Sequence, residues 1–130
     1  MTKQEFAAKA TELIQLMVDT IADKNFIKLT SSIPPRSLWA SFIDAQATPE
    51  NGCLGFGKWL NELLAIWEDE YDKKFVIDHF SASCLDKKEL REGNIVTYHP
   101  TSFGEKLDFW FEIDFKVENE QLTAVFDINF

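Results

Sequence analysis

The 130-residue chain contains few of the residues that mark metal-binding, disulfide-rich or glycine-rich proteins: two cysteines, two histidines, five glycines and four prolines. Cys53 and Cys84 form no Cys-x-x-Cys pattern and have no histidine at zinc-ligand spacing, so we expect free thiols rather than a disulfide or a metal site. No apolar run approaches the length that spans a bilayer, and the N-terminus lacks the apolar core of a signal peptide. These features predict a cytoplasmic protein without a cofactor.

Positive charge is also scarce, because 13 Lys and Arg residues face 22 Asp and Glu residues and leave a net charge of −9. Nucleic acids and anionic membrane surfaces are bound through clustered Lys and Arg, so the charge balance disfavours both as partners. A basic protein partner is compatible with it, since complementary charge speeds association.

Aromatic residues are abundant, with twelve Phe and four Trp, and 45% of the chain is apolar. This composition argues against a disordered chain, which has little hydrophobicity and few aromatics. A chain of this length fits one domain and can bury a core. We therefore expect residues 1–130 to form a single domain.

Residues 107–130 predict a long antiparallel hairpin. Apolar and polar residues alternate from Leu107 to Val117 and again from Leu122 to Phe130, which is the two-residue period of a strand with one buried face. A two-residue turn at Asn119 and Glu120 sets the apolar residues of the two strands opposite one another on one face. The predicted pairs are Val117 with Leu122, Phe115 with Ala124, Ile113 with Phe126, Phe111 with Ile128 and Phe109 with Phe130.

Helices are predicted ahead of this hairpin. Thr2 and Glu5 form a capping-box pattern, and apolar residues at helical spacing predict a first helix from there to about Asp23. We expect a short element at residues 26–29, a short helix at residues 38–45 and a longer helix at residues 56–70. Residues 48–57 are rich in glycine and proline, which predicts a loop.

Four strand candidates follow, at residues 75–85, 94–103, 106–117 and 121–130, separated by polar turns. Helices followed by a meander predict an α+β fold, with N-terminal helices packed on a curved antiparallel sheet of four or more strands. The economical arrangement is a half-open cone, in which the sheet curls around the first helix.

Three segments carry a resemblance to a known family: a helix end and polar turn at residues 23–27, a helix before the sheet at residues 57–64 and a closing hairpin at residues 115–123. Together with the order of elements, they resemble the nuclear-transport-factor-2-like superfamily of cystatin-like α+β cones, which includes polyketide cyclases and ketosteroid isomerases. The family usually has Gly where this chain has Glu120, and often a strand where residues 37–46 are more helical here. The resemblance implies a pocket between sheet and helices and, as in many members, a dimer through the outer sheet face.

The resemblance thus implies a site for a small apolar ligand. The predicted pocket residues are Trp59, Leu63, Phe80, His99, Phe111 and Phe126. A homodimer is expected through Trp110, Thr123 and Val125, which make the predicted outer face more apolar than a solvated sheet requires. The alternatives are that the aromatic residues fill the cone as core and that the outer apolar residues are isolated ones of the kind common on surfaces.

Catalytic candidates are few. His79 and His99 lie in predicted strands, where either one could serve as a pocket acid or base, although a hydrogen-bonded structural histidine is more common. Asp78 cannot orient His79 in a regular strand, because neighbouring residues point to opposite faces. Ketosteroid isomerases use a carboxylate base with Tyr and protonated Asp donors, and the first helix here has no Tyr, so no catalytic residue of that family can be transferred.

Two other patterns have simple explanations. The segment from Gly52 to Lys58 nearly matches a phosphate-binding loop, but Trp59 stands where Ser or Thr must bind magnesium, so we expect a glycine-rich helix start. The acidic residues at 68–72 lie at a helix end where the dipole disfavours negative charge, and no calcium-loop spacing is present. A solvated helix end followed by Lys73 and Lys74 is the simplest interpretation.

Three functions are compatible with the sequence. The first is the ligand-binding cone without evident catalysis. The second is an inhibitor or immunity protein that binds a basic partner through Glu68, Asp69, Glu70, Asp72 and an acidic outer sheet. The third is a lyase or isomerase that uses His79 or His99.

Overall fold

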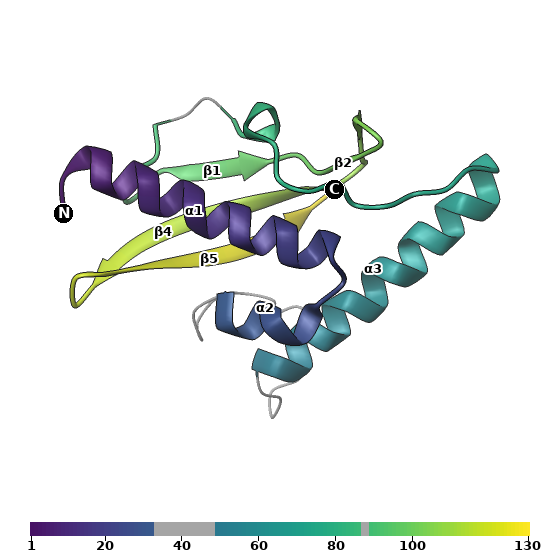
Figure 1. Ribbon diagram of the computed structural model, residues 1–130, viewed down its shortest axis with the longest axis horizontal. Helices are drawn as coiled ribbons and strands as arrows, with labels where there is room; N and C mark the ends of the chain where they lie inside the picture. The colour runs from purple at the N-terminus through teal and green to yellow at the C-terminus, as the bar shows by residue number, and fades with distance from the viewer. Residues whose placement is uncertain (33–48, 87–88) are drawn as a thin grey trace.

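The computed structural model describes residues 1–32, 49–86 and 89–130. Its helices are α1 (Lys3–Ala22), α2 (Phe26–Ser32), α3 (Pro49–Tyr71) and the 3-10 helix η2 (Ala82–Cys84). Its strands are β1 (Ile95–Tyr98), β2 (Thr101–Ser102), β3 (Glu105–Lys106), β4 (Trp110–Glu118) and β5 (Gln121–Asn129) (Figure 1). This order confirms the predicted α+β class, while the helix predicted at residues 38–45 lies outside the described residues.

Helix α1 begins and ends where the sequence predicts. Oγ1 of Thr2 accepts a hydrogen bond of 3.1 Å from the N–H of Glu5, an N–H that has no partner within the first helical turn. At the other end, Lys24 has a positive φ of 58°, and the N–H of Asn25 donates to the carbonyl oxygen of Thr20 at 3.0 Å. The buried face of α1 comprises Phe6, Ala10, Ile14, Met17, Val18, Thr20 and Ile21.

Helix α3 begins at Pro49, so the loop predicted at residues 48–57 is wrong for residues 49–57. Proline suits the first helical turn, because its fixed φ is helical and its missing N–H is not needed there. Helix α2 packs closely against Gly57, where a Cβ would overlap the ring of Phe26. Since residues 52–58 are helical, they form no phosphate-binding loop.

The three strands β1, β4 and β5 form one antiparallel sheet in the order β1-β4-β5, and β2 and β3 form a separate two-stranded hairpin. The predicted register of the long hairpin is confirmed for Val117 with Leu122, Phe115 with Ala124, Ile113 with Phe126 and Phe111 with Ile128. The fifth predicted pair, Phe109 with Phe130, lies beyond the ends of β4 and β5. The turn places Asn119 and Glu120 at positive φ, 51° and 64°, as in hairpin turns whose twist matches the strands.

The strand predicted at residues 75–85 is wrong. Residues 75–81, which we call the crossing segment, lead from α3 back past the end of α1, and they form no strand. Their N–H groups are bound largely by side chains instead of by a neighbouring strand. The N–H of Phe75 donates to Oε1 of Glu68 (3.1 Å), and that of Val76 donates to Oγ of Ser102 (2.9 Å). The N–H of Phe80 donates to Oδ1 of Asp19 (2.8 Å), and that of Ser81 donates to the hydroxyl of Tyr98 (3.1 Å).

The outer edge of β1 is occupied by residues 84–86. Leu85 forms an isolated antiparallel bridge with Tyr98. The N–H of Asp86 donates to the carbonyl oxygen of Thr97 at 2.8 Å, and the N–H of His99 donates to that of Cys84 at 2.9 Å. The predicted strand at 94–103 is also interrupted at Pro100, which cannot donate to a ladder.

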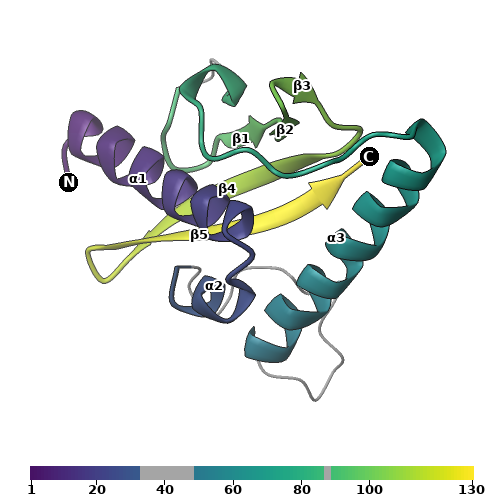
Figure 2. The ribbon, with the colours of Figure 1, turned by 45° about the vertical axis from the view of Figure 1, so that its right-hand side comes forward.

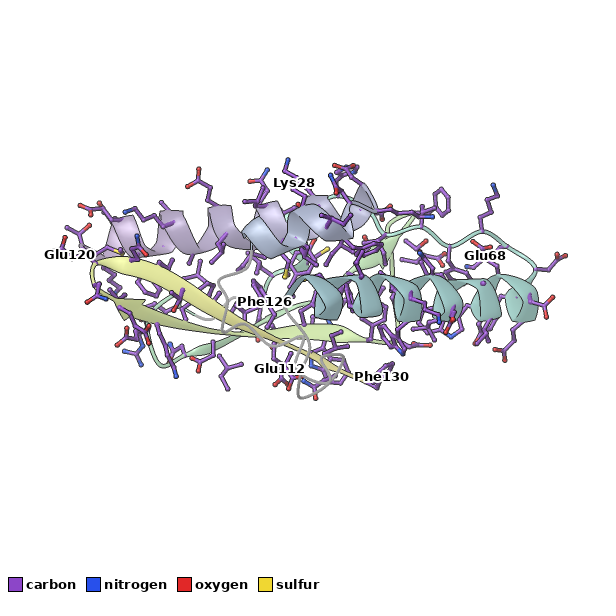
Figure 3. All side chains as sticks on the ribbon, turned by 90° about the horizontal axis from the view of Figure 1, so that it is seen from below. Lys28, Glu68, Glu112, Glu120, Phe126 and Phe130 are labelled. Carbon is purple, nitrogen blue, oxygen red and sulfur yellow. The ribbon has the colours of Figure 1, made fainter. Side chains whose placement is uncertain are left out.

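The helices α1, α2 and α3 lie on one side of the three-stranded sheet, as Figure 3 shows from below. In Figure 2, α1 crosses in front of β4 and β5. Aromatic rings join the layers: Phe6 of α1 meets Phe115 at a centroid distance of 5.9 Å, and Phe56 of α3 meets Phe111 at 6.4 Å. The helix-facing side of the sheet is therefore the core side, and the half-open cone stays a prediction.

Candidate functional site

The sheet face toward the helices, the inner face, is tightly packed at the predicted pocket residues. Phe111 and Phe126 are 1% and 0% exposed. Trp59 stacks on Phe56 at 5.9 Å, and Phe80 stacks on Tyr98 with ring centroids 5.6 Å apart and planes 16° apart. Leu63 packs against the same core. Phe111 and Phe126 thus belong to the buried core, and Trp59, Leu63 and Phe80 are partly buried and pack against it.

The sixth predicted pocket residue, His99, lies on the opposite side of the sheet, so the prediction was wrong for this residue. Tyr98 pairs with Phe111 and is 1% exposed on the inner face. Neighbouring residues along an extended chain point to opposite faces, and the ring of His99 accordingly meets that of Trp110 at 6.0 Å. His99 cannot line a pocket together with Phe111 and Phe126.

The sheet face away from the helices, the outer face, presents its side chains in rows across the strands. The first row holds His99, Trp110 and Asn129. The second holds Thr97, Glu112 and Asp127, the third Ile95 and Asp114, and the fourth Lys116 and Thr123. All of these residues are exposed or half-buried. Trp110 and Thr123 therefore lie on the face predicted for them, while the side chain of Val125 lies outside the described residues.

Glu112 and Asp127 occupy directly opposite positions in the β4–β5 ladder. Asp114 lies two residues further along β4 on the same face, so three carboxylates share the centre of the outer face. Like charges directly opposite each other in a sheet cost about 0.2–1 kcal/mol. Figure 3 shows Glu112 pointing away from the helices, so no described helix shields this charge.

Trp110 links the aromatic row to the acidic row. Its Nε1 donates to Oε1 of Glu112 over 3.4 Å, a long contact, and its ring is half-buried between His99 and the second row. In the same row, Nδ2 of Asn129 is buried and has no hydrogen-bond partner among the described residues. The arrangement is an aromatic plane beside two carboxylates that face solvent.

The second histidine, His79, is exposed and contacts a carboxylate of α1. Its Nε2 lies 2.7 Å from Oδ1 of Asp23 at the end of α1. Asp78 does not orient His79; its carboxylate instead accepts hydrogen bonds from Thr101 Oγ1 (2.7 Å), Phe103 N–H (3.1 Å) and Gly104 N–H (2.8 Å). The strand geometry from which we expected Asp78 and His79 to point apart is absent here, because residues 75–81 form no strand.

Those bonds affect the acidity of Asp78. Partial burial raises the pKa of its carboxyl, but the hydrogen bonds from Gly104, Thr101 and Phe103, helped by the nearby His79, lower the pKa below the ordinary 3.8 overall. Asp78 thus holds the β2–β3 turn in its ionised form. That turn places Phe103 at a positive φ of 50° and leaves it 69% exposed.

Both cysteines are free thiols, as predicted. Cys53 is 1% exposed in α3, and burial raises its pKa to about 11, so it is a poor nucleophile at neutral pH. Cys84 is half-buried and lies near the hydroxyl of Tyr98, whose pKa is raised chiefly by burial. The two histidines contact Asp23 and Trp110, and neither thiol is paired with them as a nucleophile is with its base.

The acidic cluster at the end of α3 divides into two parts. Glu68 is used structurally, since it accepts the hydrogen bond from Phe75 N–H. Asp69, Glu70 and Asp72 are exposed, and Lys73 pairs with Glu105 at 3.0 Å. The exposed acids agree with the predicted solvated helix end.

A separate groove of about 730 Å³ runs between α1 and the tip of the β4–β5 hairpin. Leu13, Leu16 and Leu122 give it apolar walls, while Lys9, Glu12, Asp19, Glu120 and Gln121 supply polar ones. None of the predicted pocket residues lines it. Its size lies within the range of ligand sites.

The described residues contain neither a metal-binding cluster nor a membrane-spanning helix. No group of three or more His, Cys, Asp or Glu side chains there is placed to hold a metal ion. No helix in the same part of the chain is long and apolar enough to cross a membrane.

Comparison with known proteins finds no matching family model, curated protein or solved structure. The resemblance to nuclear-transport-factor-2-like proteins therefore stays a prediction.

The sequence did not reveal several residues that organise the region between α3 and the sheet. Asp19 and Asp78 accept backbone N–H groups far along the chain, and Glu68 accepts one from a residue beyond the end of its own helix. Each is a carboxylate in a polar position, and nothing in the local pattern distinguishes it from a solvated one. The role of the Tyr98 hydroxyl as an acceptor was not predicted either, because no strand pairing was predicted for its partner, Ser81.

Proposed function

We propose that this domain is an acidic protein-binding module whose outer sheet face recognises a basic partner. The observation that carries the proposal is the direct pairing of Glu112 with Asp127 on a face that no described helix covers. In the free protein this pairing is destabilising. A cationic partner would turn the same repulsion into attraction, which is the behaviour of a surface selected for binding rather than for stability.

The overall charge supports the same conclusion. A net charge of −9 attracts a basic protein over a distance of about a Debye length, roughly 8–10 Å at physiological salt, and so raises the association rate. Asp69 and Glu70 at the exposed end of α3 add to this field. We propose the cytoplasm as the site of action.

The outer face is less suited to the homodimer that the family resemblance implies. A two-fold interface through Trp110, Thr123 and Val125 brings the same patch of each copy together. Glu112, Asp114 and Asp127 of one copy would then face those of the other, and like-charge contacts at an interface are costly. We therefore favour a different, basic partner over a second copy of this chain.

The test is a binding measurement with a defined partner. Proteins that crosslink to the immobilised chain are identified, and each is purified separately. The association rate of each purified protein with the chain is then measured at low and at high salt. We expect basic partners, an association rate that falls steeply with salt, and a slower rate for Glu112→Gln with Asp127→Asn. The control is Asp69→Asn with Glu70→Gln, which removes the same charge from α3. An association rate that does not respond to salt contradicts the proposal.

A small-molecule function is the second candidate, favoured by the groove between α1 and the hairpin tip. Its walls combine Leu13, Leu16 and Leu122 with polar side chains, as ligand sites do. Native mass spectrometry tests this candidate, because one spectrum reports both a retained small molecule and the number of subunits. A retained mass that Leu16→Glu abolishes favours this candidate over the first.

A further inference from the structure

The aromatic row and the acidic row of the outer face lie next to each other on two adjacent strands. Trp110 and Glu112 are two residues apart on β4, and Asp127 on β5 lies directly opposite Glu112. The indole contacts Glu112 through Nε1, so the ring and the carboxylates lie within reach of a single side chain. This combination is more specific than negative charge alone.

We infer that this place, formed by Trp110, Glu112 and Asp127, receives an arginine side chain of the basic partner. The inference rests on the proposed function and deepens it, because it names the residue type that is recognised and where. The guanidinium group is planar, stacks on aromatic rings and donates paired hydrogen bonds to carboxylates. A lysine ammonium is a compact charge that cannot stack and bind two carboxylates in this way.

Both carboxylates have oxygen atoms left for such a ligand. Oδ1 of Asp127 accepts the N–H of Ile128 at 2.8 Å, and Oε1 of Glu112 accepts the long bond from Trp110. No bond from the described residues reaches Oδ2 of Asp127 or Oε2 of Glu112. These two oxygens belong to opposite strands, and a guanidinium has enough N–H groups to meet both.

His99 places a second aromatic ring beside Trp110, at 6.0 Å and 35°. It packs beside the indole from the β1 side and adds a second aromatic ring next to the place where the guanidinium would bind. Trp and Arg are the residue types most enriched where binding energy is concentrated in protein interfaces. We therefore expect Trp110, with Glu112 and Asp127 beside it, to make the strongest contact with the partner.

The test uses two peptides of equal length and charge, one carrying arginine and the other lysine at the same positions. Their dissociation constants are measured by calorimetry at low salt against the full chain. We expect the arginine peptide to bind about three- to tenfold more tightly. Trp110→Thr should remove this preference, and Trp110→Phe should keep part of it because a smaller ring remains.

Charge variants separate the site from the general attraction. We expect Glu112→Gln with Asp127→Asn to weaken the arginine peptide about tenfold or more, and the matched Asp69→Asn with Glu70→Gln to weaken it less than about threefold. Thermal melting of each variant shows that it is folded. The preference for the arginine peptide over the lysine peptide is measured on the unmodified chain, so it does not depend on any variant being folded.

The possible outcomes distinguish the two proposals. Equal binding of both peptides, weakened by the outer-face variants, overturns the arginine site and leaves the proposed function standing. An equal loss in the α3 control overturns both the arginine site and the assignment of the outer face. If neither peptide binds at low salt, recognition of a basic partner is itself contradicted.

Discussion

The carboxylate of Asp19 in α1 accepts a hydrogen bond of 2.8 Å from the backbone N–H of Phe80. The contact joins the first helix to the crossing segment, although 61 positions separate the two residues. It is the kind of bond whose loss leaves a partly buried donor without a partner, at a cost of about 1–3 kcal/mol.

Asp19→Ala should therefore lower the free energy of unfolding by about 1–3 kcal/mol, measured by urea denaturation. Glu12→Ala is the matched control, because Glu12 is an exposed acid in the same helix and its replacement also removes one negative charge. Equal effects of the two substitutions would show that the bond to Phe80 contributes nothing.

Asp78 predicts a dependence of stability on pH. Its pKa in the folded chain is lowered below 3.8, so its contribution is fully present above that value and is lost as the pH falls through the folded pKa. Asp78→Asn should lower the free energy of unfolding by about 1–3 kcal/mol near neutral pH. The difference from the unmodified chain should shrink on acidification below about pH 4, and a difference that stays constant down to the acid transition would contradict this role.

Gly57 predicts a steric limit on the packing of α2 against α3. Alanine favours a helix by about 1 kcal/mol over glycine, yet Gly57→Ala should destabilise the protein by about 1–3 kcal/mol because the new Cβ overlaps the Phe26 ring. Combining it with Phe26→Leu should cost less than the sum of the two single changes. Simple additivity in chemical denaturation would rule out the predicted contact.

The hairpin turn predicts a stabilising substitution. Glu120 has a φ of 64°, a conformation that costs a residue with a Cβ about 1–2 kcal/mol. Glu120→Gly should raise the free energy of unfolding by about 0.5–1 kcal/mol. Glu120→Ala removes the same charge and keeps a Cβ, so a gain for alanine as large as for glycine would assign the effect to charge.

The sequence predicted the elements whose side chains repeat with a fixed period. The register of the β4–β5 hairpin followed from alternation and a short turn, because a shift by one residue would turn Phe111, Ile113 and Phe115 away from the core. Helix α1 followed from its apolar spacing and from the cap at Thr2. In both cases local pattern and tertiary packing favour the same structure.

The errors fall where long-range contacts decide the structure. Residues 75–85 have strand-like composition, but the N–H groups of Phe75 and Phe80 are bound by Glu68 and Asp19, which no local pattern indicates. Residues 49–57 contain several glycines and nevertheless lie in α3, where Gly57 leaves room for the ring of Phe26 from another helix. The register of the β4–β5 hairpin predicted which of its residues lie on the outer face. The contact between Trp110 and His99 was not predicted, because it requires the pairing of β1 with β4.

The bridge between Leu85 and Tyr98 has a consequence for how this molecule behaves in a crowded solution. A bare strand edge is a template on which another chain can assemble, and it promotes aggregation. At β1 that edge is already engaged by Cys84 and Asp86. Loss of this short stretch, for example by proteolytic cleavage near Leu85, would expose the backbone of β1 and make self-assembly through sheet extension the expected fate of the nicked chain.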